Sequence, residues 1–225
     1  MKIGDLIWGV ALVIVSSFLL FPVTREIFVQ VTKEFPYAMG FVKVAVLATM
    51  GELLALRIIA GKWRTPPGIV YRMIIWGILG MSFVITFDVY ANGVAASAKK
   101  GLLFAGGAYS GIMTAFWTSV IANLTFAPTM MAFHRITDTC IDLADGRFDK
   151  FGSISLRQVV NQIDWYGFVG FVICRTIPFF WVPAHTITFL LPPEYRVLMA
   201  AFLSIALGAI LAFAKRAKKP EMTSA

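Results

Sequence analysis

The chain has 225 residues, of which 59% are hydrophobic and only 14% charged, and its mean hydropathy is +0.79. This composition excludes an ordinary soluble domain, in which about a quarter of the residues are charged, and predicts an integral membrane protein. The net charge is +8, but the basic residues lie between apolar segments and form no basic domain. We therefore expect them to set the membrane topology and to contact membrane lipid, and we expect no nucleic-acid partner.

Six apolar segments approach the roughly 20 residues that a helix needs to cross the hydrocarbon core. They cover residues 6–21, 35–60, 69–92, 102–133 or 109–133, 165–191 and 193–213, and proline, glycine or charged residues separate them. We therefore expect an all-α integral membrane protein, a polytopic helical bundle that forms a single transmembrane domain over residues 1–225. Four to six of the segments are true spans. In the four-span alternative, the first and fifth segments lie at the interface or re-enter the membrane.

The charges of the loops predict the orientation. With six spans and both termini inside, twelve lysines and arginines fall on the inner side, including the basic tail 215–225, and five on the outer side. Cytoplasmic loops of membrane proteins are enriched in these residues, so the positive-inside rule favours this topology. Because no presequence is recognisable, we expect a microbial cytoplasmic membrane.

The long polar connection 134–162 carries a row of acids. Asp138, Asp142, Asp145 and Asp149 recur at spacings of four, three and four residues, which places them on one face of a helix. We expect an amphipathic helix on the membrane surface, with the acids on its solvated face. A divalent-cation site is the alternative interpretation of the same row.

Charged residues inside the apolar segments cost about 2.5–3.5 kcal/mol each, so each requires a partner or an escape to the membrane surface. Arg57 and Arg72 lie near the inner ends of their segments, from which their side chains can extend to the interface. Lys43 and Asp88 both fall toward the outer side and can pair. Glu52 lies deeper, on the second segment.

The segment 165–191 combines a charge near its middle with two prolines that bend or break a helix. Arg175 is that charge, and our structural hypothesis pairs it with Glu52 or places both at a shared polar cavity. His185 follows the second proline, and Asn123 lies on the fourth segment among hydroxyl side chains. His185 is either a pH-sensitive gate or a hydrogen-bonded structural group. The candidates for a pore or polar cavity are Glu52, Arg175, His185, Asn123, Lys43 and Asp88.

Small-residue pairs predict close helix contacts. The pairs are Gly77 with Gly80, Gly107 with Gly111, and Gly167 with Gly170. The middle pair has the four-residue spacing of membrane helix dimers, which leaves a homo-oligomer open.

Signatures of catalysis are absent from the sequence. It contains no glycine-rich phosphate loop, no His-Glu-x-x-His and no Gly-x-Ser-x-Gly. Cys140 and Cys174 do not form a Cys-x-x-Cys motif, and we interpret them as small buried thiols. We therefore expect a protein that is not an enzyme and that has no catalytic residues, no cofactor and no metal.

The sequence 181–189, WVPAHTITF, is followed by a proline and then by Arg196. This run resembles the C-terminal signature of the Mpv-seventeen and peroxisomal-membrane-protein (twenty-two kDa) family, Trp-Pro-x-x-Gln-x-x-Asn-Phe with a proline and an arginine after it. Histidine and threonine stand here where the family has glutamine and asparagine. The positions that match or adjoin the family's motifs are Gly51, Pro128, Trp165, Trp181, Pro183 and Arg196.

The resemblance implies a small protein of organelle or microbial membranes that acts as a weakly selective channel for small solutes and takes part in metabolite homeostasis. We therefore expect a channel or carrier whose partners are membrane lipid and small solutes. The alternative is a structural or accessory membrane protein that does not transport and instead binds lipid or a partner.

Overall fold

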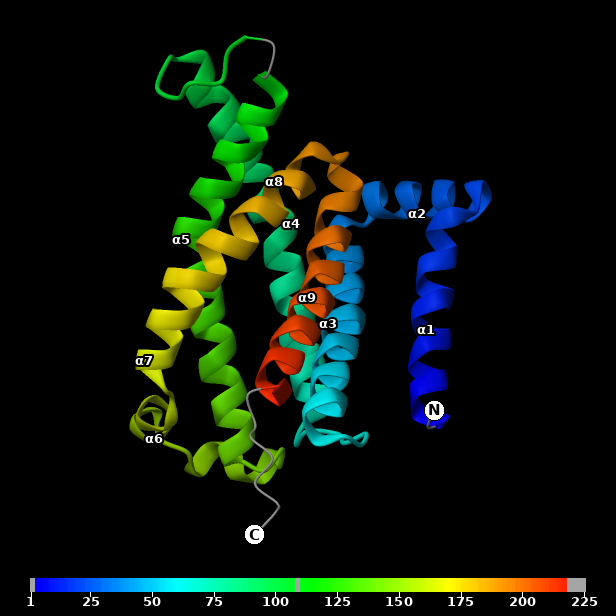
Figure 1. The fold of residues 1–225 in the computed structure, drawn as a ribbon, viewed down its shortest axis with the longest axis vertical. Coiled ribbons are helices and arrows are strands. Elements are labelled where there is room, and N and C mark those ends of the chain that lie inside the picture. The colour runs from blue at the N-terminus through cyan, green and yellow to red at the C-terminus, as the bar shows by residue number, and fades with distance from the viewer. Residues whose placement is uncertain (1–2, 108–109, 218–225) are drawn as a thin grey trace.

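The computed structural model describes residues 3–107 and 110–217, in which all regular structure is helical (Figure 1). The elements are α1 (Ile3–Leu20), α2 (Pro22–Glu34), α3 (Pro36–Ala60), α4 (Ile69–Lys99), α5 (Ser110–Leu143), the 3₁₀ helix η1 (Phe148–Ser153), α6 (Leu156–Gln162), α7 (Trp165–Gly167), the π-helix η2 (Phe168–Trp181), α8 (Val182–Leu190) and α9 (Pro193–Ala217). The expected all-α class is confirmed for these residues. Lys218, Lys219 and the rest of the basic tail beyond residue 217 lie outside them, as does Tyr109.

Four helices are long and apolar enough to cross a membrane. They are α1, α4, the continuous helix Trp165–Leu190 formed by α7, η2 and α8, and the part Pro193–Phe213 of α9. Their most apolar windows have mean hydropathies between 1.5 and 2.2. These helices support a membrane protein, because a helix satisfies its own backbone hydrogen bonds in lipid. The second predicted segment contains the whole of α3, and the fourth forms the first part of α5; neither helix is among the four.

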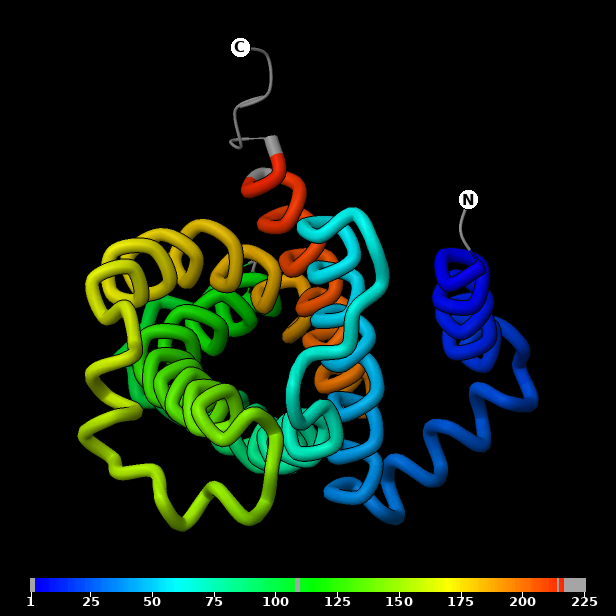
Figure 2. Tube along the Cα trace, turned by 90° about the horizontal axis from the view of Figure 1, so that it is seen from below, coloured from blue at the N-terminus to red at the C-terminus, as the bar shows by residue number. Residues whose placement is uncertain are grey.

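A ring is formed by α3, α4, α5, the continuous helix Trp165–Leu190 and α9 (Figure 2). α3 packs against α4 and α9, α4 against α5, and α5 against α8 and η2, while α8 closes the ring on α9. α2 and the turn between α8 and α9 lie at one end of this ring, called here the α2 end, and α6 lies at the opposite α6 end (Figure 1). α1 begins and α9 ends toward the α6 end, so both ends of the described chain lie on the same side.

α1 stands outside the ring (Figure 2). Two side chains attach its first half: Asp5 forms an ion pair with Arg57, with Oδ1 2.8 Å from Nε, and Trp8 donates from Nε1 to the carbonyl of Met50 at 3.0 Å. None of its residues is buried. Arg57 therefore has a carboxylate partner at the α6 end, in addition to lying near the end of α3.

Glycines bring α3 and α4 into close contact. A Cβ atom added to Gly80 would meet the carbonyl oxygen of Gly40 and lie 2.8 Å from the Cβ of Val44. A Cβ added to Gly77 would overlap the ring of Phe41. The predicted contact at Gly77 and Gly80 is confirmed, whereas a Cβ built on Gly111 or Gly170 has no neighbouring atom within 4 Å in the described part of the chain.

The connection 134–162 does not form one continuous helix, and the expected amphipathic surface helix is not confirmed. Its first ten residues continue α5 to Leu143, and the helix ends where Asp145 and Gly146 adopt left-handed backbone angles, φ 53° and 67°. The amide of Gly146 donates to the carbonyl of Ile141 at 2.9 Å, as in a Schellman cap. The separate short helices η1 and α6 complete the connection. Glycine at this position provides the left-handed turn that a continuous helix cannot contain.

The helix α2, at the opposite end of the ring from α6, has a mixed surface of apolar and charged side chains. α2 lies across the ends of α1 and α3 (Figure 1) and buries Phe28 and Thr32, while Arg25 and Lys33 remain exposed. A helix of this kind suits the boundary between lipid tails and headgroups, because its apolar side can face the bundle and its charges can face water.

Candidate polar sites in the helical bundle

Arg72 lies at the centre of a buried charge cluster near the α6 end. Its residue is 4% exposed, and its Nη1 lies 3.2 Å from Oε1 of Glu52 and 3.0 Å from Oδ1 of Asp138. Its Nη2 contacts Oδ1 of Asp142, and its Nε donates to the carbonyl of Pro67 at 3.1 Å. One guanidinium on α4 therefore joins carboxylates from α3 and α5.

The side chains of this cluster come together because α3 ends, α4 begins and α5 ends at the same end of the ring (Figure 1). The expectation that Arg72 extends to the membrane surface is wrong, since its side chain is buried among three acids. The predicted pair of Glu52 with Arg175 is also wrong. Arg175 is exposed on η2, and Glu52 pairs with Arg72 on the neighbouring antiparallel helix.

A histidine that sequence analysis did not select adjoins the cluster. The His134 ring packs on Trp76, with centroids 4.0 Å apart, and its Nδ1 lies 3.7 Å from Oδ2 of Asp138. Its Nε2 is buried and has no hydrogen-bond partner in the described part of the chain. The spacing of four residues between His134 and Asp138 was a usable signal, because it places the two on one helix face.

Asn123 and His185, both predicted as polar-cavity residues, are brought together by α5 and α8. The Asn123 amide lies 3.1–3.2 Å from Nδ1 of His185 and also donates to the carbonyl of Ser119 at 2.8 Å. The orientation of the amide and the tautomer of the ring are assigned from these contacts. His185 is 9% exposed, and its Nε2 has no hydrogen-bond partner among the described residues. The rings of Phe87 and Trp181 lie 5.7 and 4.9 Å from that of His185.

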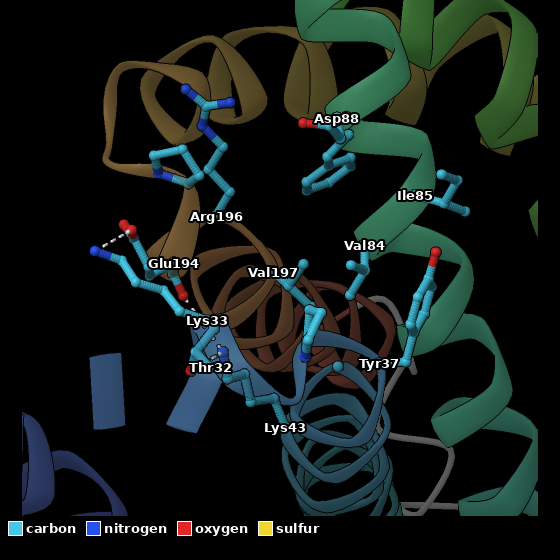
Figure 3. Close-up of a pocket in the computed structure, with 14 residues that line it drawn as sticks. Thr32, Lys33, Tyr37, Lys43, Val84, Ile85, Asp88, Glu194, Arg196 and Val197 are labelled. Carbon is cyan, nitrogen blue, oxygen red and sulfur yellow. Dashed lines mark hydrogen bonds and ion pairs between the residues drawn. The ribbon is translucent and has the colours of Figure 1, made fainter. Parts of the chain in front are cut away.

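Lys43 and Asp88 line the same cavity at the α2 end but do not form an ion pair (Figure 3). The Lys43 ammonium donates to Oγ1 of Thr32 at 3.0 Å and to the carbonyl of Glu194 at 3.3 Å. The ring of Phe28 lies 4.4 Å from the same nitrogen. The predicted pairing is therefore wrong, because Lys43 turns toward α2 and α9 while Asp88 lies on α4 across the cavity (Figure 3).

Comparison with known proteins gives no match. No family model, curated protein or solved structure matches the chain. The family resemblance described above therefore depends on its motif residues alone.

Most of those motif residues have structural contacts in this fold. Gly51 faces α9, where a built Cβ would lie 3.1 Å from Cα of Ile205. Trp165 donates from Nε1 to the carbonyl of Val160 at 2.9 Å, and Trp181 lies beside His185. Pro128 lies inside α5, and Pro183 occupies the first turn of α8. Arg196 donates from Nε to the carbonyl of Leu191 at 3.0 Å and lines the cavity at the α2 end.

The acids of the polar connection do not form a single solvated row. Asp138 and Asp142 face Arg72, whereas Asp149 pairs with Arg147 at 2.7 Å in the exposed turn. The hydrogen bond from Arg147 holds the pKa of Asp149 below its usual value. Within residues 3–107 and 110–217, no group of three or more metal-ligating side chains is arranged to hold an ion. Asp145 stands in the left-handed turn that ends α5.

Proposed function

We propose that this chain is a six-span membrane protein that gives small solutes a weakly selective path, in agreement with the family resemblance. The six spans are α1, α3, α4, α5, the helix Trp165–Leu190, and α9, with both termini on the cytoplasmic side of a microbial membrane. The alternating directions of these helices in Figure 1 support this number. So does the excess of lysine and arginine in the loops toward the α6 end.

The observation that carries the proposal is the presence of buried polar atoms that have no hydrogen-bond partner among the residues that the structure describes. They include Nε2 of His134 and Nε2 of His185, which belong to two different polar clusters. A buried polar group without a hydrogen bond costs about 1–3 kcal/mol, and in lipid the cost is larger. Water or a polar solute between the helices removes this cost. Such a hydrated interior is what a solute path requires.

The proposed path runs from the cavity at the α2 end to the Arg72 cluster at the α6 end. Phe87 lines that cavity and lies beside His185, so the cavity and the Asn123–His185 pair adjoin. Trp76 packs on His134 beside the Arg72 cluster, and Phe87 lines the cavity. At a rise of 1.5 Å per residue, these two residues are roughly 16 Å apart along the axis of α4. Phe83 lies in this interval, packed on Phe87 and Phe126 with centroids 5.6 and 6.0 Å away. These rings form the apolar constriction of the path.

One observation favours an accessory role instead. α1 lies outside the ring and exposes apolar side chains along its length, among them Ile7, Val13 and Ile14. In a protein that does not transport, this helix would hold lipid or a partner, and the buried charges would serve helix packing only.

Solute flux through proteoliposomes tests the proposal. We expect vesicles with the purified wild-type protein to release small polar solutes faster than empty vesicles. We expect His185→Phe to change this rate several-fold, because it replaces an unpaired polar atom beside the constriction with an apolar ring. Arg175→Gln is the matched control, since it removes a charge from the same helix at an exposed position.

Size-exclusion profiles must show that both variants fold. Release no faster than from empty vesicles would contradict transport and support the accessory role. Equal rates for His185→Phe and wild type would show that solutes do not pass His185.

A further inference from the structure

Lys43 is a buried cation that faces a cavity. The residue is 6% exposed, and it lies two turns inside α3, beneath α2. The cavity has a volume of about 340 Å³ and is lined by residues of α2, α3, α4 and the start of α9. Figure 3 shows Lys43 at one side of it, with Arg196 and Asp88 on the other.

The charges that line this cavity do not balance. The cations are Lys33, Lys43 and Arg196, whereas the carboxylates are Asp88 and Glu194. Lys33 and Glu194 form an ion pair, with Nζ 3.2 Å from Oε1. Arg196 and Asp88 remain as opposite charges across the upper part of the cavity (Figure 3). Lys43 is therefore the excess positive charge, and no carboxylate of the described chain lies within 4.0 Å of its ammonium.

The contacts of Lys43 among the described residues leave its charge without an anion, because the ammonium bonds two neutral oxygens and its other neighbour is the Phe28 ring, 4.4 Å away. An ammonium group carries three N–H donors, and Lys43 uses two of them on neutral oxygens of Thr32 and Glu194. A buried cation is costly unless an anion compensates it. Both neutral contacts orient the ammonium without cancelling its charge.

We propose that this cavity binds one singly charged oxyanion, with Lys43 as its main contact and Arg196 at its rim. The anion is the carboxylate of a small solute or the phosphate of an acidic lipid headgroup, and both present the same chemistry to an ammonium donor. The position at the α2 end, beneath the mixed surface of α2, is open to either source. This inference deepens the proposed function by fixing the charge of the solute at that end, but its test measures binding and not flux.

Binding is measured as the thermal unfolding midpoint of the full-length protein. One arm, in neutral detergent, titrates sodium acetate against sodium chloride at constant ionic strength. The other arm, in lipid nanodiscs, replaces phosphatidylcholine by phosphatidylglycerol. We expect the wild type to be stabilised in at least one arm, because a ligand that binds only the folded state raises the midpoint. We expect Lys43→Met to weaken the apparent affinity about tenfold or more, since it removes a charge-assisted hydrogen bond.

Lys62→Met is the matched control, because it removes the same charge at an exposed position after α3. It should retain the wild-type response. Stabilisation by acetate identifies a free carboxylate as the ligand, and stabilisation only by phosphatidylglycerol identifies a lipid headgroup. If Lys43→Met does not fold, Arg196→Gln replaces it and should weaken binding. No stabilisation of the wild type in either arm, or an unchanged response in a folded Lys43→Met protein, would overturn the proposal. Anion binding by a protein that shows no solute flux would support this site and contradict the transport proposal.

Discussion

Two arginines in apolar helices show how position decides the energetic role of the same side chain. Arg72 is buried and holds carboxylates of Glu52, Asp138 and Asp142, so its removal would leave acids close together without a cation. Arg175 is exposed on η2. A charge that compensates three others stabilises the fold, whereas an exposed charge contributes little.

We therefore expect Arg72→Met to destabilise the protein by about 3–5 kcal/mol, as the loss of one partner from a buried ion pair does. Arg175→Met should change the free energy of unfolding by no more than about 0.5 kcal/mol. Denaturant-induced unfolding in detergent micelles measures both. Equal losses for the two variants would show that burial among carboxylates is not what distinguishes Arg72.

At the scale of the elements, the contact between α3 and α4 depends on backbone proximity. The carbonyl of Gly40 faces Gly80, and a Cβ at Gly40 would lie 2.6 Å from Cγ2 of Val84. Helices in membranes gain little from excluding water, so close packing at small residues is a main source of their association. Glycine is needed here because any side chain would separate the two backbones.

Gly80→Ala should destabilise the protein by about 1–3 kcal/mol, because the added methyl group overpacks this contact. Gly93→Ala is the control on the same helix, since a Cβ there has no atom within 4 Å. We expect this control to show no loss of stability. Thermal unfolding of the two purified variants compares them. A Gly80→Ala protein as stable as Gly93→Ala would mean that the helices can separate at no cost.

For the whole molecule, the ring of helices and the position of α1 determine which loops share a side. Lys62 follows α3, and Arg157 lies in α6, so both are toward the α6 end (Figure 1). Arg25 in α2 and Lys100 after α4 are toward the α2 end. Six spans place these two groups of residues on opposite sides of the membrane.

Single cysteines in a background without Cys140 and Cys174 test this topology. We expect Arg25→Cys and Lys100→Cys to react with a membrane-impermeant maleimide added outside intact cells. Lys62→Cys and Arg157→Cys should react only after the cells are opened.

If Arg25→Cys labels from the same side as an N-terminal tag, α1 does not cross the membrane and the six-span arrangement is contradicted. All four positions are exposed, so a lack of reaction cannot arise from burial in the protein.

The sequence by itself determined the helical class and the membrane character of this protein. Length and apolarity of a segment are local properties, and a helix of about 20 residues satisfies its backbone without any neighbour. The glycine pair at residues 77 and 80 was also predictable, because a close contact needs small residues on one face. The end of α5 could have been located from Gly146, which lies in the left-handed turn after the helix, but the row of acids around it favoured a continuous helix.

Only the tertiary structure decided which polar groups meet. Glu52 pairs with Arg72 on the next helix, and the ring of His134 packs on Trp76 of α4. Lys43 bonds the carbonyl of Glu194, which is 151 residues away in the chain. Each residue turns a helix by about 100°, so the face that a charge presents depends on rotation and register that composition does not encode. The sequence identified Glu52 and Arg175 as deep charges. Packing of α4 against both α3 and α5 gave Glu52 a different arginine, because Arg72 of α4 reaches carboxylates on both neighbouring helices.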